Sequence, residues 1–303
     1  MVLENQVKVA APQQIKLLVI DIDGTLLTPQ KRITPRTLAA IRAAQETGVI
    51  VTLATARRYY NTAPIATELG IAIPLILYDG ALILEHPQGT PLYTHRLRAD
   101  IAQQAVEIMV HHHIQPVIHH INGPAEQIWT GPAEFDNAWI EDYLSTFPDH
   151  TRRLPYANCC TGQPDPLRVV AFTDEEVARE LVPEISALAC SWNITPRGSY
   201  NWAEVAVMGQ GCTKASGVIM LARQFGIPLE QVMAIGDNNN DVEMLQAVGW
   251  GVAMGQASDA VKASARAVTA SNTEDGVALA IERYILRRAA QVASNSFSRS
   301  ICL

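Results

Sequence analysis

An apolar run that ends in two aspartates constrains the fold of this chain more than any other stretch. Residues 15–20 carry five apolar side chains in six positions, and Asp21 and Asp23 follow directly. Such a run is typical of a strand buried on both faces of a parallel sheet. Because α/β proteins place ligands beyond the carboxyl ends of such strands, the carboxylates are predicted to lie at a metal or nucleophile site. Gly24 allows a sharp turn behind them, although Asp and Gly also occur in acidic turns without function.

Length and composition narrow the class of protein. The chain has 303 residues, 48% of them hydrophobic, which is enough for a full core and two domains. A formal charge of −7 without any basic block argues against a nucleic-acid partner. The apolar runs are too short to span a membrane, and the N-terminus lacks the pattern of a secretory signal. We therefore expect a cytoplasmic protein without a membrane partner, whose five cysteines are reduced thiols.

Strands and helices alternate at close intervals after this first run. Thr34 and Pro35 predict the start of a helix that closes at Gly48. Apolar runs at residues 49–54 and 74–77 predict two more strands, separated by a second helix. This alternation predicts an α/β fold with a doubly wound, mostly parallel, Rossmann-like sheet.

The pattern changes near residue 85 and returns near residue 198. Turn-forming residues and a hairpin lead into the elements predicted for this segment: helices at 100–112 and 174–188, and strands at 115–121, 167–172 and 191–195. The returning core is predicted to contain strands at 203–208, 232–235 and 251–254, and a closing helix at 274–290. The predicted organisation is a leader at 1–14, a core at 15–84 and 198–290, an inserted α+β cap domain at 85–197, and a mobile tail at 291–303.

Six polar residues lie at or beside the ends of the predicted core elements. They are Asp21, Asp23, Thr55, Lys214, Asp237 and Asp241. Asp237 and Asp241 are four residues apart across a predicted helix start, so they can share one face. Calcium loops of the EF-hand type are excluded, because Val242 and Val248 occupy the required glycine and glutamate positions. Carboxylates with one lysine and one threonine suit Mg²⁺ and a phosphoryl group, and an aspartate can act as the nucleophile.

Four motifs of this sequence resemble those of haloacid dehalogenase-superfamily phosphatases. They are Asp21-Ile22-Asp23-Gly24-Thr25, Thr55 within Leu53-Ala54-Thr55-Ala56-Arg57, Lys214, and Gly236-Asp237-Asn238-Asn239-Asn240-Asp241. The cap-sized insertion between the second and third motifs is similar to that of the Cof-type members, which form subclass IIB and carry a C2 cap. The resemblance covers roughly residues 15–290 and is weakest through the predicted cap.

The resemblance implies a Mg²⁺-dependent phosphatase that hydrolyses phosphomonoesters of small metabolites, such as sugar phosphates, through an aspartyl-phosphate. The implied catalytic residues are Asp21 as the nucleophile, Asp23 as the acid/base, Thr55 and Lys214. The residues implied for binding the substrate phosphate are Gly24, Thr55, Lys214 and Asn240. The residues implied for Mg²⁺ are Asp21, Asp23 through its backbone carbonyl, Asp237, and Asp241 in support.

Three other functions stay open at this point. A phosphomutase or phosphotransferase would return the phosphoryl group to substrate instead of water. A signalling receiver also combines aspartates with a threonine and a lysine, but it has no use for the long insertion. A non-catalytic binding protein would have no need of intact Asp21, Asp23, Lys214 and Asp237. We expect a small phosphorylated metabolite as the partner, and a monomer or homodimer.

Three residues depart from the usual family pattern. Ala56 replaces a glycine, Asp79 replaces an asparagine, and Gln256 replaces a frequent asparagine. None of these changes removes a catalytic group. Asp79 adds a negative charge near the mouth of the implied site, so a substrate preference cannot be carried over from the family.

Five histidines lie between residues 111 and 120, a density that could indicate a transition-metal site. The adjacent trio at 111–113 cannot all face one way, and i, i+4 partners on a helix are missing. The favoured interpretation is therefore a helix end followed by an exposed strand in the predicted cap.

Overall fold

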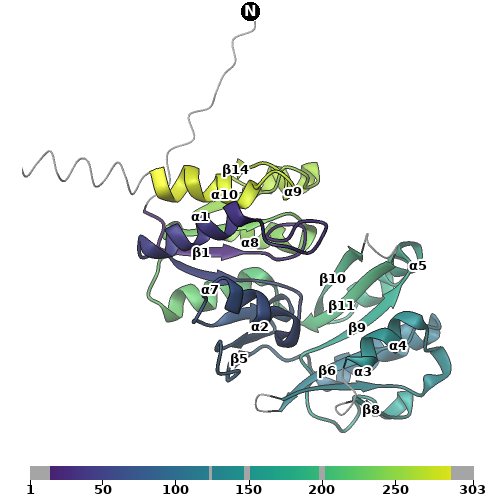
Figure 1. Cartoon of the computed structure of the whole chain (residues 1–303). Coiled ribbons are helices and arrows are strands. Elements are labelled where there is room, and N and C mark those ends of the chain that lie inside the picture. Colours follow the sequence, from purple (N-terminus) through teal and green to yellow (C-terminus); the bar gives the residue numbers. More distant parts are fainter. Residues whose placement is uncertain (1–13, 123–124, 147–150, 198–201, 288–303) are drawn as a thin grey trace, which may run out of the picture. The chain divides into compact units, whose positions relative to one another are not determined.

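The computed structural model describes residues 14–122, 125–146, 151–197 and 202–287, which form two compact units (Figure 1). Among these residues, unit 1 comprises 14–53, 69–71 and 219–287, and unit 2 comprises 54–68 and the described part of 72–218. Unit 2 thus contains the predicted cap together with neighbouring segments of the predicted core. The predicted core and cap boundaries therefore stay a prediction. The predicted tail, and the predicted leader apart from Gln14, lie outside the described residues.

Unit 1 is built on a five-stranded sheet in the order β14-β13-β12-β1-β2, with every neighbouring pair parallel. Its strands are β1 (Leu17–Ile20), β2 (Ile50–Leu53), β12 (Val232–Gly236), β13 (Trp250–Ala253) and β14 (Ala267–Val268). All four residues of β1 are buried, because neighbouring strands and helices cover both faces of the sheet. The predicted parallel α/β sheet is confirmed.

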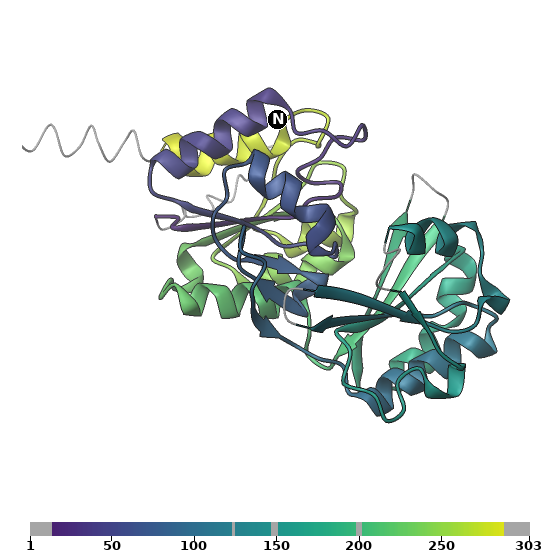
Figure 2. The same ribbon diagram turned by 60° about the horizontal axis from the view of Figure 1, so that its bottom comes forward.

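The helices of unit 1 pack against this sheet and against one another. Its helical elements are α1 (Pro35–Glu46), η4 (Leu229–Gln231), η5 (Asn239–Asp241), α8 (Val242–Ala247), α9 (Asp259–Ser264), α10 (Gly276–Ile281) and a π-helical turn, η6 (Glu282–Leu286). α1 lies beside α10 in both ribbon views (Figures 1 and 2). The predicted N-cap is present, because the Thr34 hydroxyl accepts a hydrogen bond from the Thr37 amide at 3.1 Å.

Unit 2 begins with a short antiparallel sheet in the order β3-β4-β5. Its elements are α2 (Tyr59–Glu68), β3 (Leu75–Leu77), the single turn η1 (Tyr78–Gly80), β4 (Leu82–Leu84) and β5 (Pro91–Thr94). The predicted hairpin is formed by β4 and β5. Helix α7 (Lys214–Gln224) begins in unit 2 and continues into unit 1.

The rest of unit 2 is a six-stranded sheet in the order β10-β11-β9-β6-β7-β8. Its strands are β6 (Val117–Asn122), β7 (Ala125–Thr130), β8 (Thr151–Arg153), β9 (Arg168–Thr173), β10 (Cys190–Arg197) and β11 (Trp202–Gly209). Its helices are α3 (Ala99–His111), η2 (Ala133–Phe135), α4 (Ala138–Ser145), η3 (Tyr156–Asn158), α5 (Glu175–Glu180) and α6 (Val182–Ser186). The single helix predicted at 174–188 is therefore wrong. Two short helices occupy this stretch, and Pro183 lies in the first turn of the second.

Apolar side chains cover both faces of this six-stranded sheet. On one face, side chains of α3, α5 and α6 pack against Ile118, Val169 and Val205. On the other face, Ile140 and Leu144 of α4 pack against a smaller group of strand residues, Val117, Ile128, Val170 and Ala206. We call this second side the α4 face. It carries fewer apolar residues than the first face, and the rest of it is polar.

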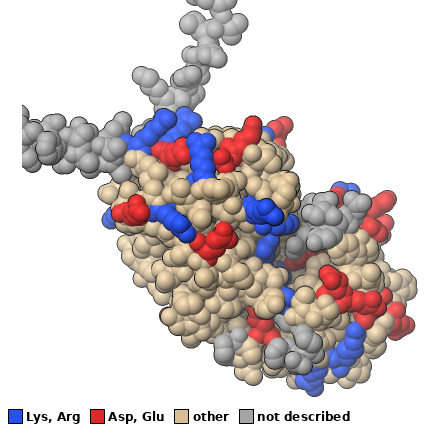
Figure 3. Space-filling model, in the orientation of Figure 1, with Lys and Arg blue, Asp and Glu red and all other residues tan. Residues whose placement is uncertain are grey.

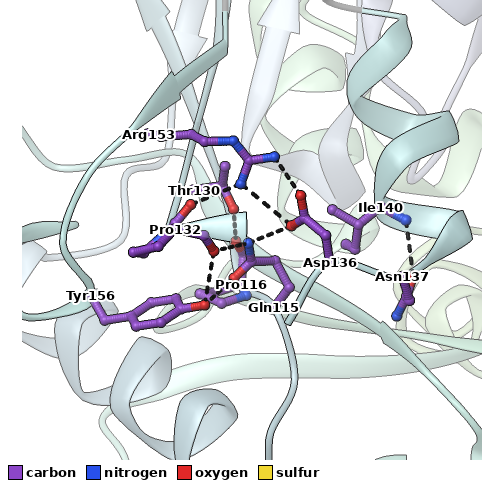
Figure 4. Close-up of polar contacts among 10 residues, drawn as sticks. Gln115, Pro116, Thr130, Pro132, Asp136, Asn137, Ile140, Arg153 and Tyr156 are labelled. Atoms are coloured by element: carbon purple, nitrogen blue, oxygen red, sulfur yellow. Dashed lines mark hydrogen bonds and ion pairs between the residues drawn. The ribbon is translucent and has the colours of Figure 1, made fainter. Parts of the chain in front are cut away.

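A polar network joins Gln115, which lies between α3 and β6, to the loop after β7 and to Arg153 of the edge strand β8 (Figure 4). The Gln115 side-chain amide donates to the Pro132 carbonyl at 2.7 Å and to Asp136 at 2.6 Å. It also accepts from the Tyr156 hydroxyl at 2.7 Å. Arg153 completes the network through an ion pair of 2.5 Å with Asp136. Because buried Gln115 is fully bonded in this way, the network serves to fix the loop between β7 and α4.

The histidine interpretation is half right. His111 ends α3, as predicted, but His119 and His120 lie on β6 and are buried, so the exposed strand is wrong. The reason is that β6 is an inner strand with helices over both faces. Burial lowers the pKa of His119 well below its ordinary value, and burial followed by the charge of Arg96 lowers that of His120 to about 4. Both rings are therefore neutral near pH 7.

Two further predictions concern the whole chain. Cys159, Cys160, Cys190 and Cys212 are free thiols, as predicted, while Cys302 lies outside the described residues. Within the described part of the chain, no helix has the length and apolar character needed to cross a membrane. On the face drawn in Figure 3, basic and acidic side chains of the described residues are interspersed, without an extended basic patch.

Candidate active site

The sheet of unit 1 brings three of the predicted carboxylates together. Asp21 follows β1 and Asp237 follows β12, and these strands are paired so that the Asp21 amide donates to the Ile235 carbonyl at 3.0 Å. One oxygen each of Asp21, Asp237 and Asp241 lie within 4.8 Å of one another. Among the described residues, this is the only group of three or more histidine, cysteine or acidic side chains with such spacing. Oxygen ligands in this number fit Mg²⁺, which also relieves the repulsion between carboxylates.

Asp241 supports this cluster through the backbone. It is fully buried, and its Oδ2 accepts hydrogen bonds from the amides of Asp237 at 2.9 Å and of Asn238 at 3.0 Å. A Cβ atom on Gly236 would lie 2.6 Å from the Cβ of Asp241, so a side chain there would push Asp241 away. The loop geometry therefore orients Asp237. Asn240 lies in the same turn, η5.

Thr25 contacts Asp237 directly, and Gln256 supports the neighbouring Gly24. The Thr25 hydroxyl donates to Asp237 Oδ1 at 2.6 Å. The Gln256 side chain donates to the Gly24 carbonyl at 2.5 Å and accepts from the Asn272 amide at 3.2 Å. Sequence reasoning assigned no role to Thr25 or Gln256. Their roles depend on contacts across more than 200 positions of the chain, and only the presence of Thr25 within a motif signalled its importance.

Replacing Gly24 with alanine is expected to weaken Mg²⁺ binding by about tenfold or more. Substitution of residues that support metal ligands generally has an effect of this size. Gly24 has φ +82°, and a Cβ there would lie 2.2 Å from Asp237 Oδ2, so the carboxylate must move. Mg²⁺ titrations followed by calorimetry measure the change. Gly48→Ala is a matched control, because Gly48 has φ +86° and nothing within 4 Å of the added atom. Equal Mg²⁺ affinity in the two variants would contradict this account.

Asp23 lies on the loop beyond β1. Its side chain is 34% exposed and forms an ion pair of 3.0 Å with Lys31. The loop is closed by backbone hydrogen bonds from Leu26 to Asp21 and from Leu27 to Ile22. The Asp23 carboxylate is not a member of the three-carboxylate cluster found among the described residues.

Thr55 and Lys214 lie on two separate segments of unit 2, and the turn η1 contacts Thr55 and the residue before Lys214. Thr55 and Lys214 are both buried. The Thr55 carbonyl accepts from the Asp79 amide at 3.0 Å, and the Cys212 thiol lies 3.8 Å from the Asp79 carbonyl. Gly80 lies so close to the start of α7 that a Cβ there would be 2.2 Å from the Thr213 carbonyl oxygen. The turn η1 therefore fixes both the Thr55 segment and the residue before Lys214.

This turn has an unusual backbone. Tyr78 and Asp79 have φ of 51° and 53°, a left-handed conformation that non-glycine residues adopt rarely. Hydrogen bonds from the Tyr78 amide to the Arg57 carbonyl and from the Asp79 amide to the Thr55 carbonyl hold it in place. Such strain occurs most often at functional sites. Sequence reasoning noticed Asp79 only as a departure from the family pattern.

Comparison with known proteins agrees with this geometry. The haloacid dehalogenase-like hydrolase family matches residues 18–281. The 5-amino-6-(5-phospho-D-ribitylamino)uracil phosphatase of Bacillus subtilis (strain 168) is 29% identical over 88% of this chain and 97% of its own. The pyridoxal phosphate phosphatase of Escherichia coli (strain K12) is 27% identical over 89% of this chain and 99% of its own. A solved sugar phosphatase of subclass IIB is similar with a TM-score of 0.73 and 26% identity, over 89% of this chain and 98% of its own. The resemblance predicted from the four motifs is confirmed.

Proposed function

The chain belongs to the haloacid dehalogenase-like hydrolase family and is a phosphatase, and on this premise we propose that it depends on Mg²⁺ and hydrolyses phosphomonoesters of small metabolites through an aspartyl-phosphate. The observation that carries the proposal is the cluster of Asp21, Asp237 and Asp241 at the ends of β1 and β12. The names of the relatives support the substrate class, since they describe phosphatases of small phosphorylated compounds.

Asp21 and Asp23 perform the two halves of the reaction in this proposal. The Asp21 carboxylate attacks phosphorus and forms an acyl phosphate as the bond to the ester oxygen breaks, and Asp23 gives a proton to that oxygen. Asp23 then takes a proton from a water molecule that attacks phosphorus. This second step breaks the bond to Asp21 and releases phosphate.

The remaining residues bind the phosphoryl group and the metal. The residues proposed for the phosphoryl oxygens are Gly24, Thr55, Lys214 and Asn240. The residues proposed for Mg²⁺ are Asp21, the Asp23 carbonyl and Asp237, with Asp241 in support. When bound, the ion supplies positive charge that stabilises the negative charge on the phosphoryl oxygens. Lys214 adds a second positive charge, and Thr55 donates a hydrogen bond.

Of the alternatives, only the phosphomutase or phosphotransferase has the same core chemistry. The family match over residues 18–281 and the phosphatase relatives count against the receiver and the binding protein. A mutase would shield the phosphorylated Asp21 from water and produce an isomer of the substrate. Release of stoichiometric phosphate from one monoester, with no accumulating isomer, distinguishes the hydrolase from the mutase.

Removing the metal is expected to abolish activity reversibly. Phosphate release should disappear in a chelator and return on addition of Mg²⁺, but not of Ca²⁺, which prefers more ligands in a looser geometry. Mg²⁺ should also raise the melting temperature, because a ligand at 100 times its Kd stabilises the folded state by about 2.7 kcal/mol. Full turnover by metal-free enzyme would overturn the Mg²⁺ assignment.

A further inference from the structure

Two amide side chains of unit 1 hold the loop that follows β1. Gln256, in the turn after β13, donates from Nε2 to the Gly24 carbonyl at 2.5 Å. Asn272, in the turn before α10, donates from Nδ2 to the Leu27 carbonyl at 2.8 Å. The Asn272 backbone amide also donates to Gln256 Oε1 at 3.2 Å, so the two residues are joined to each other. We call Gln256 and Asn272 the amide pair.

The turns that carry the amide pair are packed closely against each other. The Gly255 amide donates to the Ala270 carbonyl at 3.0 Å. A Cβ atom on Gly255 would lie 2.9 Å from backbone atoms of residues 269–271, so the two backbones are almost in contact. Glu274 Oε2 accepts from the Ser271 hydroxyl at 2.7 Å and from the Ser271 amide at 3.2 Å, which fixes the second turn. The amide pair therefore has a preformed support, which limits its movement.

The loop has its own anchor and does not depend on the amide pair to stay folded. Leu26 and Leu27 are 3% and 4% exposed, and their amides close the loop through hydrogen bonds to the carbonyls of Asp21 and Ile22. Gln256 is exposed, so water competes for its hydrogen bond and the bond adds little to the stability of the fold. Stability alone thus does not explain why two side chains bind two carbonyls of one loop.

The two carbonyls belong to the immediate neighbours of Asp23. Gly24 directly follows Asp23, and Leu27 is paired with Asp23 in a parallel β-bridge. Gly24 has φ +82° and no side chain, so its own structure restricts rotation of its carbonyl very little. The exposed ion pair of Asp23 with Lys31 is a weak restraint. Fixing the Gly24 and Leu27 carbonyls fixes the backbone of Asp23, and hence the direction in which its side chain leaves the loop.

We propose that Gln256 and Asn272 are positioning residues, which hold the backbone around Asp23 so that its carboxylate lies where the ester oxygen is protonated. This inference rests on the proposed function, in which Asp23 gives a proton to that oxygen as its bond to phosphorus breaks. A catalytic group that is misplaced by about 1 Å can lower a rate about 10²-fold. A modest rotation of the Gly24 carbonyl is therefore enough to affect the reaction without unfolding the loop.

Two esters that differ in their need for a proton test the proposal. The measured quantity is kcat/KM at saturating Mg²⁺, which covers the steps up to departure of the leaving group. Gln256→Met removes the donated hydrogen bond while keeping the length and neutrality of the side chain. It should lower kcat/KM for p-nitrobenzyl phosphate by about tenfold or more, because an alkoxide needs a proton to leave. For p-nitrophenyl phosphate the change should be less than about threefold, because p-nitrophenolate leaves without one.

Asn272→Leu provides an independent variant, and Gln104→Met a matched control. Asn272→Leu removes the bond to the Leu27 carbonyl and should produce the same selective loss. It carries the test if Gln256→Met does not fold, and if neither variant folds, the pair serves the fold and the positioning role is wrong. Gln104 is an exposed glutamine of α3 whose side-chain amide also donates to a backbone carbonyl, that of Asp100 at 3.3 Å. Gln104→Met should leave both kcat/KM values unchanged.

Combination with Asp23→Asn separates positioning from a general effect on the loop. If the amide pair acts through the Asp23 side chain, its loss has no further consequence once that side chain no longer transfers a proton. Adding Gln256→Met to Asp23→Asn should therefore lower kcat/KM for p-nitrobenzyl phosphate by less than about threefold more, since residues that act together are not additive.

Two different failures can be told apart. Equal losses on both esters, no loss on either, or a full additional loss in the Asp23→Asn background would each show that the positioning proposal is wrong, while the phosphatase assignment stands. The proposed function fails through other results: wild-type enzyme with Mg²⁺ releases no phosphate from either ester, or Asp23→Asn alone loses the same factor on both.

Discussion

Replacing Asp21 with asparagine is expected to remove phosphatase activity almost entirely, by about the 10⁶-fold seen when other enzymes lose their nucleophile. An amide oxygen cannot attack phosphorus to form the acyl phosphate. The fold should survive, since asparagine has the same shape and the Asp21 backbone amide still bonds to Ile235. Steady-state phosphate release and thermal melting measure the two effects.

The metal-free form of this variant provides an internal check. Asp21 shares its site with Asp237 and Asp241, so loss of one charge relieves repulsion in the absence of metal. Metal-free Asp21→Asn should therefore melt no lower than metal-free wild type, and Mg²⁺ should stabilise it less. Asp142→Asn, an exposed change of the same type on α4, should alter neither property. Near wild-type turnover by Asp21→Asn would show that another group attacks the phosphate.

Replacing Asp23 with asparagine is expected to have effects that depend on the leaving group. General acid and base assistance contributes about 10²- to 10⁴-fold. A sugar alkoxide needs a proton as it leaves, so hydrolysis of a sugar phosphate should almost disappear. The p-nitrophenolate ion leaves without one, so the first half of the reaction should proceed and the second should stall. Rapid mixing should show a burst of about one p-nitrophenolate per enzyme.

Asp23 is a suitable position for this test, because the ion pair that the change removes contributes little to stability. Its ion pair with Lys31 is exposed, and such pairs contribute at most about 1 kcal/mol. Lys31→Met removes the same ion pair while keeping Asp23, and it should retain turnover on both substrates. If Asp23→Asn lowers the rate of hydrolysis equally for both substrates and shows no burst, Asp23 has only a structural role.

The placement of Asp21 and Asp237 in the carboxylate cluster could be predicted, because local sequence determines it. The apolar runs before Asp21 and Asp237 dictate buried parallel strands, and parallel strands bring their carboxyl ends to one edge of a sheet. The support around these residues was not predictable in the same way. Thr25 and Gln256 act on residues far along the chain, and Asp241 acts as a helix cap for the amides of Asp237 and Asn238.

The six-stranded sheet of unit 2 was harder to predict than the carboxylate cluster of unit 1. Strand β7 and helix α4 were missed, because the Gly and Pro residues around them read as loop. His119 and Arg168 look like surface residues in sequence, and only the register of β6 against β9 shows that they are buried opposite each other. The Arg168–Glu204 pair depends on the same long-range pairing, which no local pattern specifies.

In the proposed mechanism, the phosphoryl group passes through Asp21. The most direct test of this step is mass analysis of Asp23→Asn, quenched in acid within the first turnover of p-nitrophenyl phosphate in the presence of Mg²⁺. We expect one phosphoryl group per chain, located on Asp21 by peptide fragmentation, and none on the Asp21→Asn/Asp23→Asn double variant. Burst release of p-nitrophenolate with no phosphoryl group on the protein, or with the group on another residue, would contradict the covalent mechanism proposed for Asp21.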